Sequence, residues 1–348
     1  MSVTAGGAVT DSGTLAISGA TTLNSGSADL TLDQSGSTFG TLAITGANVA
    51  VTENAAMDLG ASTISGTASF NSTSNAITDS GTLAITGATT INSGSADLTL
   101  DDAASTFGAL AITGANVAVT ENAAMDLGAS TISGTASFNS TSNAITDSGT
   151  LAITGATTLN SGSADITLNE AASTFGTLAI TGTNVAVTEN AAMDLGASTI
   201  SGTASFNSSN NAITDSGTLA ITGVTTLNSG SADLTLDEAA STFGALAITG
   251  ANVAVTENAA MDLGASTISG TASFNSTSNA ITDSGTLAIT GVTTINSGSA
   301  DLTLNEASST FGTLVLTGAN VAVTDAGAAD LGVSTVSGTF GITSGGAI

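Results

Sequence analysis

The five residues Asp79-Ser80-Gly81-Thr82-Leu83 recur along the whole chain and decide how it is organised. Copies of Asp-Ser-Gly-Thr-Leu begin at Asp11, Asp79, Asp147, Asp215 and Asp283. Each copy begins 68 residues after the one before, so five repeats account for nearly all 348 residues. A fixed period of this kind is typical of stacked repeat architectures. We expect one continuous solenoid over residues 1–348, with repeats at about 11–78, 79–146, 147–214, 215–282 and 283–348.

Acidic, aromatic and methionine residues follow the same period. Two acidic columns are Asp29, Asp97, Asp165, Asp233, Asp301 and Glu53, Glu121, Glu189, Glu257, Asp325. The phenylalanines form columns at Phe39, Phe107, Phe175, Phe243, Phe311 and at Phe70, Phe138, Phe206, Phe274, while Met57, Met125, Met193 and Met261 form another. Such columns predict nearly equivalent coils stacked on one another, with the phenylalanines and methionines in the core.

Within each repeat, apolar residues alternate with polar ones. Leu30 and Leu32 lie on one side of a predicted strand, and Asp29, Thr31 and Asp33 lie on the other. Short strands of this kind are expected over residues 14–18, 29–33, 48–52, 57–59 and 76–78. A five-residue strand with one apolar face needs neighbours to bury that face. The sequence therefore predicts an all-β, parallel β-solenoid with about three coils per repeat and about three strands per coil. The acidic side chains are expected on the outside of the coils.

The composition excludes most chemistry. The chain has no Lys, Arg, His, Cys, Pro, Trp or Tyr, so it lacks the usual nucleophiles, neutral-pH bases and oxyanion-binding groups, and we expect no enzyme activity. Its formal net charge of -27 predicts repulsion from nucleic acid and from anionic membrane surfaces. No stretch approaches transmembrane length, so we expect no membrane insertion. We also expect any targeting signal to lie outside this chain.

The segments at 75–90 (NAITDSGTLAITGATT) and 97–107 (DLTLDDAASTF) resemble the repeats of filamentous-haemagglutinin-like adhesins. The resemblance runs through all five copies. It implies a right-handed parallel β-helix, exported by two-partner secretion in Gram-negative bacteria as a surface-attached or released stalk. It therefore implies an extracellular or cell-surface location. The secretion domain and the adhesive or toxin module of that family are missing from this sequence.

Clustered acids raise the possibility of calcium, because this hard cation prefers carboxylate and carbonyl oxygens. The candidate ligands are Asp29, Asp33, Asp97, Asp101 and Asp102. The alternative interpretation is a solvated acidic face that keeps the protein soluble. The Gly-Gly-x-Gly-x-Asp pattern of calcium-binding β-rolls does not occur.

We expect a structural function: a rod or fibre segment of an extracellular bacterial adhesin or filament, acting as a spacer or as a self-stacking unit. Residues 3–9 resemble residues 342–348, so the predicted partner is the chain itself, by end-to-end stacking or by continuation of the same polypeptide. A host or neighbouring cell surface is a further possible partner. The alternatives are a calcium-dependent surface or matrix assembly module and an adhesive binding module.

Overall fold

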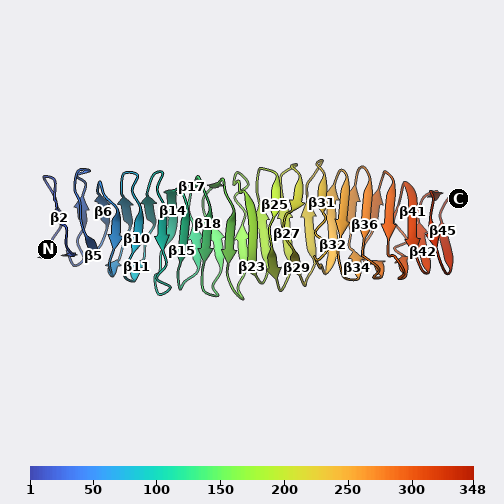
Figure 1. Ribbon diagram of the computed structural model, residues 1–348, viewed down its shortest axis with the longest axis horizontal. Helices are drawn as coiled ribbons and strands as arrows, with labels where there is room; N and C mark the ends of the chain where they lie inside the picture. Colours follow the sequence, from blue (N-terminus) through green and yellow to red (C-terminus); the bar gives the residue numbers. More distant parts are fainter. The chain divides into compact units, whose positions relative to one another are not determined.

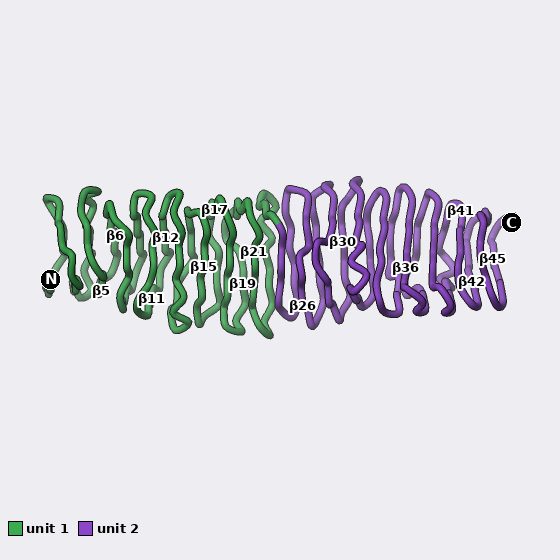
Figure 2. Tube along the Cα trace, in the orientation of Figure 1, with its two compact units in different colours: residues 1–176 green, residues 177–348 purple.

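The computed structural model describes all residues, 1–348, and contains 45 short β-strands and no helix. The fold is a parallel β-solenoid of about 17 turns. The chain divides into two compact units, Met1–Gly176 and Thr177–Ile348, coloured separately in Figure 2. In each unit the strands of successive coils stack side by side (Figure 1). The predicted fold class is confirmed, and one continuous solenoid across both units stays a prediction.

Unit 1 has two parallel sheets, called A and B. Sheet A of unit 1 contains β1 (Ser2–Thr4), β3 (Thr21–Asn24), β5 (Thr41–Gly46), β7 (Met57–Leu59), β8 (Ser62–Ile64), β10 (Ile77–Asp79), β11 (Leu83–Ile85), β13 (Leu98–Leu100), β15 (Val117–Thr120), β18 (Ala136–Asn139) and β21 (Thr157–Asn160). Sheet B of unit 1 contains β2 (Val9–Thr10), β4 (Leu30–Leu32), β6 (Val49–Thr52), β9 (Ala68–Asn71), β12 (Thr89–Asn92), β14 (Ala109–Gly114), β16 (Met125–Leu127), β17 (Ser130–Ile132), β19 (Ile145–Asp147), β20 (Leu151–Ile153) and β22 (Ile166–Leu168).

Unit 2 is built in the same way. Its sheet A contains β23 (Thr177–Gly182), β25 (Met193–Leu195), β26 (Ser198–Ile200), β28 (Ile213–Asp215), β29 (Leu219–Ile221), β31 (Leu234–Leu236), β33 (Val253–Thr256), β36 (Ala272–Asn275), β39 (Thr293–Asn296), β41 (Thr313–Gly318), β43 (Asp330–Leu331) and β44 (Thr335–Val336). Its sheet B contains β24 (Val185–Thr188), β27 (Ala204–Asn207), β30 (Thr225–Asn228), β32 (Ala245–Gly250), β34 (Met261–Leu263), β35 (Ser266–Ile268), β37 (Ile281–Asp283), β38 (Leu287–Ile289), β40 (Leu302–Leu304), β42 (Val321–Asp325) and β45 (Phe340–Ser344).

Each coil crosses the two sheets in turn, so it has two faces. The 45 strands over about 17 turns agree with the expected number of about three strands per coil. A face is made by one strand or by two short ones: β5 pairs with both β7 and β8 of the next coil. The number of residues between paired positions varies, from 17 for Thr41 and Asp58 to 22 for Ala16 and Thr38. Coil length is therefore uneven.

A 68-residue repeat does not contain a whole number of coils. In unit 1 the pairings run from β4 through β6, β9, β12, β14, β16 and β19 to β22, which is seven steps. Those steps lead from Leu30 to Ile166, a separation of two repeats, so one repeat spans three and a half coils. Seven steps also lead from β24 to β42 in unit 2.

The half coil moves equivalent residues of consecutive repeats to opposite sheets. The strand β3 belongs to sheet A, its equivalent β12 to sheet B, and the next equivalent, β21, to sheet A again. Three coils per repeat would place a copy of each residue on the same face in every third coil. The half coil makes that expectation wrong. Same-face copies in unit 1 are seven coils apart, roughly 34 Å at about 4.8 Å per coil. Charge repulsion between copies on one face is thus weaker than expected.

The core follows the alternation in the sequence. Leu30, Leu32, Met57 and Phe70 are all at most 2% exposed. The strand expected over residues 14–18 is an exception, because only an isolated bridge between Ala16 and Thr38 forms there. Its later equivalent β11 pairs with β8 of the preceding coil, and no described strand takes that place beside residues 14–18. Without that neighbour, residues 14–18 form only the single bridge.

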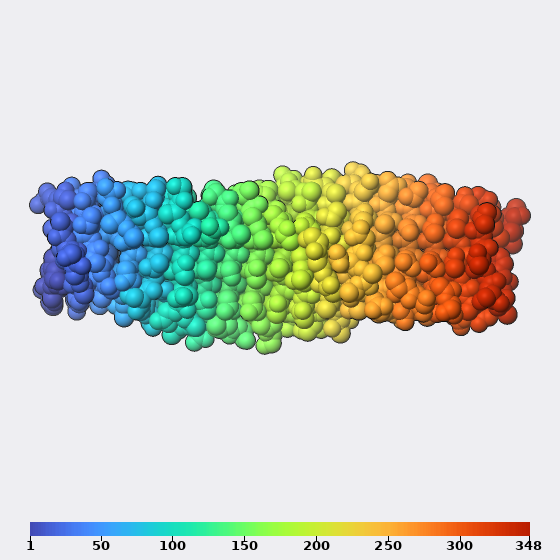
Figure 3. Space-filling view, viewed as in Figure 1, coloured from blue at the N-terminus to red at the C-terminus, as the bar shows by residue number.

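The coil corners are tight, and glycine stacks at one of them. A Cβ added to Gly87 would lie 2.5 Å from the carbonyl oxygen of Gly66, so only glycine fits there. At another corner, Thr73 and Ser74 have φ of 47° and 74° in the turn after Asn71. The segment Asn71-Ser72-Thr73-Ser74 therefore forms a tight turn. In Figure 3 the sequence colours change gradually along each unit, because each coil packs against its neighbours in the chain.

Candidate functional site

The predicted ligands Asp29 and Asp97 lie at equivalent coil corners, and both are exposed. Asp29 Oδ1 accepts hydrogen bonds from the Asn48 amide and from Asn48 Nδ2, at 3.1 and 2.9 Å. Asn48 Oδ1 in turn accepts from the Thr67 amide and hydroxyl, both at 3.1 Å. Asp97 and Asn116 repeat this arrangement. These acids therefore bind the corner of the next coil.

The other predicted ligands lie at the far ends of the same strands. Asp33 and Asp101 are exposed and Asp102 is half-buried. The amides of Asp101 and Asp102 donate to the two carboxyl oxygens of Asp79, at 2.9 and 3.3 Å. Burial, with a smaller effect from the two neighbouring acids, raises the pKa of Asp79 above its ordinary value.

The structure brings Asp101 and Asp102 close to Asp79, and it separates both from Asp97 by the strand β13. No group of three or more acidic side chains is arranged so that it could hold a metal ion. Carboxyl oxygens of Asp29, Asp79, Asp97 and Asp102 accept backbone amides instead. Calcium binding stays a prediction.

One acidic column lies inside the protein, which corrects the expectation that the acids face outward. Glu53 and Glu257 are 0% exposed, and Glu121 is 1% exposed. Glu53 follows β6, and its Oε2 accepts a hydrogen bond from the Phe39 amide at 2.9 Å. Glu121 follows β15 and accepts from the Phe107 amide at 3.1 Å. Because one repeat spans three and a half coils, Glu53 and Glu121, which are one repeat apart, extend from opposite sheets.

The second carboxyl oxygen of each of these glutamates has no partner. Oε1 of Glu53 and of Glu121 is buried without a hydrogen bond, and so are both carboxyl oxygens of Glu257. Burial raises the pKa of Glu53 to about 7 and that of Glu121 and Glu257 to about 8, against a smaller opposing effect of the neighbouring phenylalanine amide. At neutral pH, Glu121 and Glu257 are therefore mostly protonated, and the formal charge of -27 overstates the true charge.

The sequence contained a signal for this burial. In Val49-Ala50-Val51-Thr52-Glu53, the glutamate has the same parity as the two buried valines. Side chains two residues apart along a strand point to the same side. Charge alone suggested a surface position, whereas the alternation pointed to the interior.

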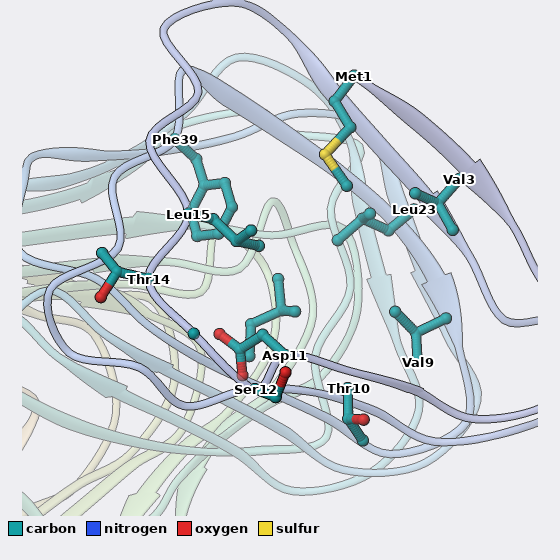
Figure 4. A pocket seen from close by; sticks show the side chains of 12 residues that line it. Met1, Val3, Val9, Thr10, Asp11, Ser12, Thr14, Leu15, Leu23 and Phe39 are labelled. Atoms are coloured by element: carbon teal, nitrogen blue, oxygen red, sulfur yellow. The ribbon is translucent and has the colours of Figure 1, made fainter.

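The first coil of unit 1 leaves the solenoid interior open. A cavity of about 500 Å³ lies there, lined by Met1, Val3, Val9, Thr10, Asp11, Ser12, Gly13, Thr14, Leu15, Leu23, Leu32 and Phe39. Figure 4 shows the apolar side chains of Met1, Leu15, Leu23 and Phe39 around one space. In unit 2 the last coils expose Val333, Phe340 and Ile348, by 91%, 46% and 75%. The apolar surface is therefore greatest at these terminal coils.

The sequence profile of a family described as repeats of unknown function (DUF5649) matches the chain throughout. The matches cover residues 1–45, 46–113, 114–181, 182–249, 250–317 and 318–348. The chain belongs to this family. No curated protein and no solved structure matches it.

A complete DUF5649 repeat is 68 residues long, the period found in the sequence, although its boundaries fall at a different phase from those expected. The repeat at 46–113 contains one buried glutamate, Glu53, and the aspartate Asp79, which accepts backbone amides of the next coil. The repeat at 250–317 has Glu257 and Asp283 in the same places. None of the elements is a helix able to cross a membrane. These two complete DUF5649 repeats thus carry a buried glutamate and an amide-binding aspartate in the same structural roles.

Proposed function

We propose that this chain is a structural spacer, a rod or fibre segment of an extracellular bacterial adhesin or filament, and that it has no enzyme activity. The observation that carries the proposal is the sameness of its repeats. The Asp97–Asn116 contact recurs as Asp233–Asn252 and as Asp301–Asn320 with nearly the same distances. An active site needs one distinct arrangement of groups, whereas a scaffold needs many equal ones.

The roles of the polar side chains support the same proposal. Ser105 Oγ accepts from the Leu83 amide at 2.9 Å, and Ser130 Oγ accepts from the Ile112 amide at 3.0 Å. Both serines are at most 4% exposed. Hydroxyls and carboxylates of this kind are occupied in joining one coil to the next, so they are not free to react with a substrate.

We also propose that the partner of the terminal coils is further coils of the same kind, in a second copy of the chain or in the same polypeptide. The outer edges of β1 and β45 support this, because no described strand pairs with them and a parallel edge is a template for another strand. Val3 pairs with Leu23 of the next coil, and Ile342 pairs with Val323 of the previous one. A second copy would cover both the open cavity beside Val3 and the exposed Phe340.

The location and the export route rest on the resemblance to filamentous-haemagglutinin-like repeats. The structure has the solenoid class that this resemblance implies, and the family to which the chain belongs has no known function. We propose an extracellular or cell-surface location on this basis. Immunogold labelling of thin-sectioned cells would test it: label confined to the cytoplasm would contradict the location and leave the spacer role standing.

Electron microscopy of the purified chain tests the spacer and the stacking separately. We expect stiff particles that lengthen into filaments as the concentration rises. Phe340→Asp should shorten the filaments, whereas Thr90→Asp, at an exposed position on the side of a coil, should leave them unchanged. Short stiff particles at every concentration would overturn the stacking alone. Flexible globular lobes would overturn the spacer.

A further inference from the structure

Three coil corners each contain a carboxyl group that is removed from water. Glu53, Glu121 and Glu257 are at most 1% exposed, and each has at least one carboxyl oxygen with no hydrogen-bond partner. Glu53 also holds the corner through its backbone: its amide donates to the Asn71 carbonyl at 2.9 Å, and its own carbonyl accepts from Thr73 Oγ1 at 2.9 Å. A change at this side chain therefore acts where segments of three consecutive coils meet.

No neighbouring group compensates a negative charge at this position. The segments packed against Glu53 present the backbone of Phe39, the end of β9 at Asn71 and the turn residue Thr73, and none of these titrates. The same holds for Glu121, which contacts Phe107, Asn139 and Thr141. No charged neighbour contributes to the pKa of either glutamate. The chain contains no Lys, Arg or His that could approach.

An ionised carboxylate in such a corner would be buried with a single amide donor or none. Burying an unpaired charge is strongly unfavourable, so the group either stays neutral or the surroundings open to water. A neutral carboxylic acid keeps its acceptor oxygen for the phenylalanine amide. The corner is therefore compatible with the protonated side chain and is strained by the ionised one.

We propose that Glu53, Glu121 and Glu257 are proton-controlled latches of the coil corners, which hold the corners closed when protonated and loosen them when ionised. The solenoid would then be stiffest in acidic to neutral surroundings and would soften in alkaline ones. This inference adds a regulatory property to the chain and does not depend on its location or its partners.

The direction of the pH dependence follows from proton linkage. The folded pKa values, about 7 for Glu53 and about 8 for Glu121 and Glu257, lie above the ordinary value of 4.5. Between these limits the unfolded state binds fewer protons than the folded state, so stability falls as pH rises. The full contribution of the latches is present below about pH 4.5 and is lost by about pH 8.

Urea unfolding followed by circular dichroism tests the proposal. The triple variant Glu53→Gln, Glu121→Gln, Glu257→Gln keeps the amide acceptor but cannot ionise. The matched control Asp33→Asn, Asp101→Asn, Asp237→Asn removes three charges at exposed, equivalent positions. From about pH 5 to about pH 8 the urea midpoint of the wild type and of the control should fall clearly, and that of the glutamine variant should fall less. Equal slopes in all three proteins would overturn the proposal.

Amide hydrogen exchange reports on a single corner, so repulsion between charges elsewhere in the chain should not alter the result. We expect Glu121 to ionise only when the corner is open. Protection of the Phe107 amide against exchange should then fall about tenfold per pH unit between about pH 5 and pH 7.5, after correction for intrinsic exchange. It should level off above about pH 8, and Glu121→Gln should abolish the dependence. Protection that is independent of pH in the wild type would overturn the latch, while the spacer role would stand.

Discussion

The carboxyl oxygen Oε2 of Glu53 lies 2.9 Å from the backbone nitrogen of Phe39, fourteen residues earlier and in the previous coil. Phe39 is 6% exposed and Glu53 is not exposed at all. An acidic side chain thus satisfies a main-chain amide that the parallel ladder leaves unpaired where the coil turns. The same contact joins Glu121 to Phe107.

Removal of this contact should destabilise the protein. Glu121→Ala leaves the buried Phe107 amide without an acceptor and should lower the free energy of unfolding by about 1–3 kcal/mol at neutral pH. Glu121→Gln, which retains an acceptor oxygen, should cost much less. Urea titrations of the two variants measure the difference. Equal losses would show that the side-chain volume, and not the hydrogen bond, matters at this corner.

The loss of stability on replacing a phenylalanine should depend on how deeply its coil buries the ring. Phe138 in β18 is 0% exposed, and Phe138→Ala should cost about 3–5 kcal/mol because it leaves a cavity. Phe340 begins β45, in the last copy of the repeat, and is 46% exposed. Phe340→Ala should therefore cost less than about 1 kcal/mol. Denaturant midpoints compare the two, and similar losses would contradict a core built by stacking.

The glycine stack provides a matched pair of positions one repeat apart. A Cβ at Gly87 would meet the Gly66 carbonyl oxygen at 2.5 Å, whereas a Cβ at Gly19 would meet nothing within 4 Å. Gly87→Ala should destabilise the fold by about 1–3 kcal/mol, because the two coils must move apart. Gly19→Ala should be close to neutral. Thermal melting of both variants is the measurement, and an unchanged melting temperature for Gly87→Ala would contradict the close stacking at this corner.

Calcium should not act as a specific ligand. The carboxylates of Asp29 and Asp97 already accept asparagine amides, and no three acids converge. Calcium and magnesium at equal ionic strength should therefore shift the melting temperature equally, by charge screening. A rise specific to calcium, reversed by chelation and lost in Asp101→Asn/Asp102→Asn, would revive the alternative of a calcium-dependent assembly module.

Local pattern accounts for most of the secondary structure. Leu30 and Leu32 were expected inside and Asp29 and Asp33 outside, and the structure places them so. This prediction is correct because successive side chains along a strand point to opposite faces, so every second residue lies on the same face. The same rule, applied as far as Glu53, would have predicted its burial. The expectation that all acids face outward is wrong at Glu53, because the alternation along the strand, and not the charge, sets the direction of the side chain.

The sequence by itself determined the 68-residue period, the short strands, the parallel stack and the lack of reactive groups. Repetition and alternation can be seen in the order of the residues alone, without knowing which segments pack together. Only the tertiary structure decided that a repeat spans three and a half coils, so that β3 and β12 lie in opposite sheets. Coil length is the sum of several uneven turns, and that sum depends on how each corner packs against the next. For the same reason, only the packed corners show that Glu53 is buried beside Phe39.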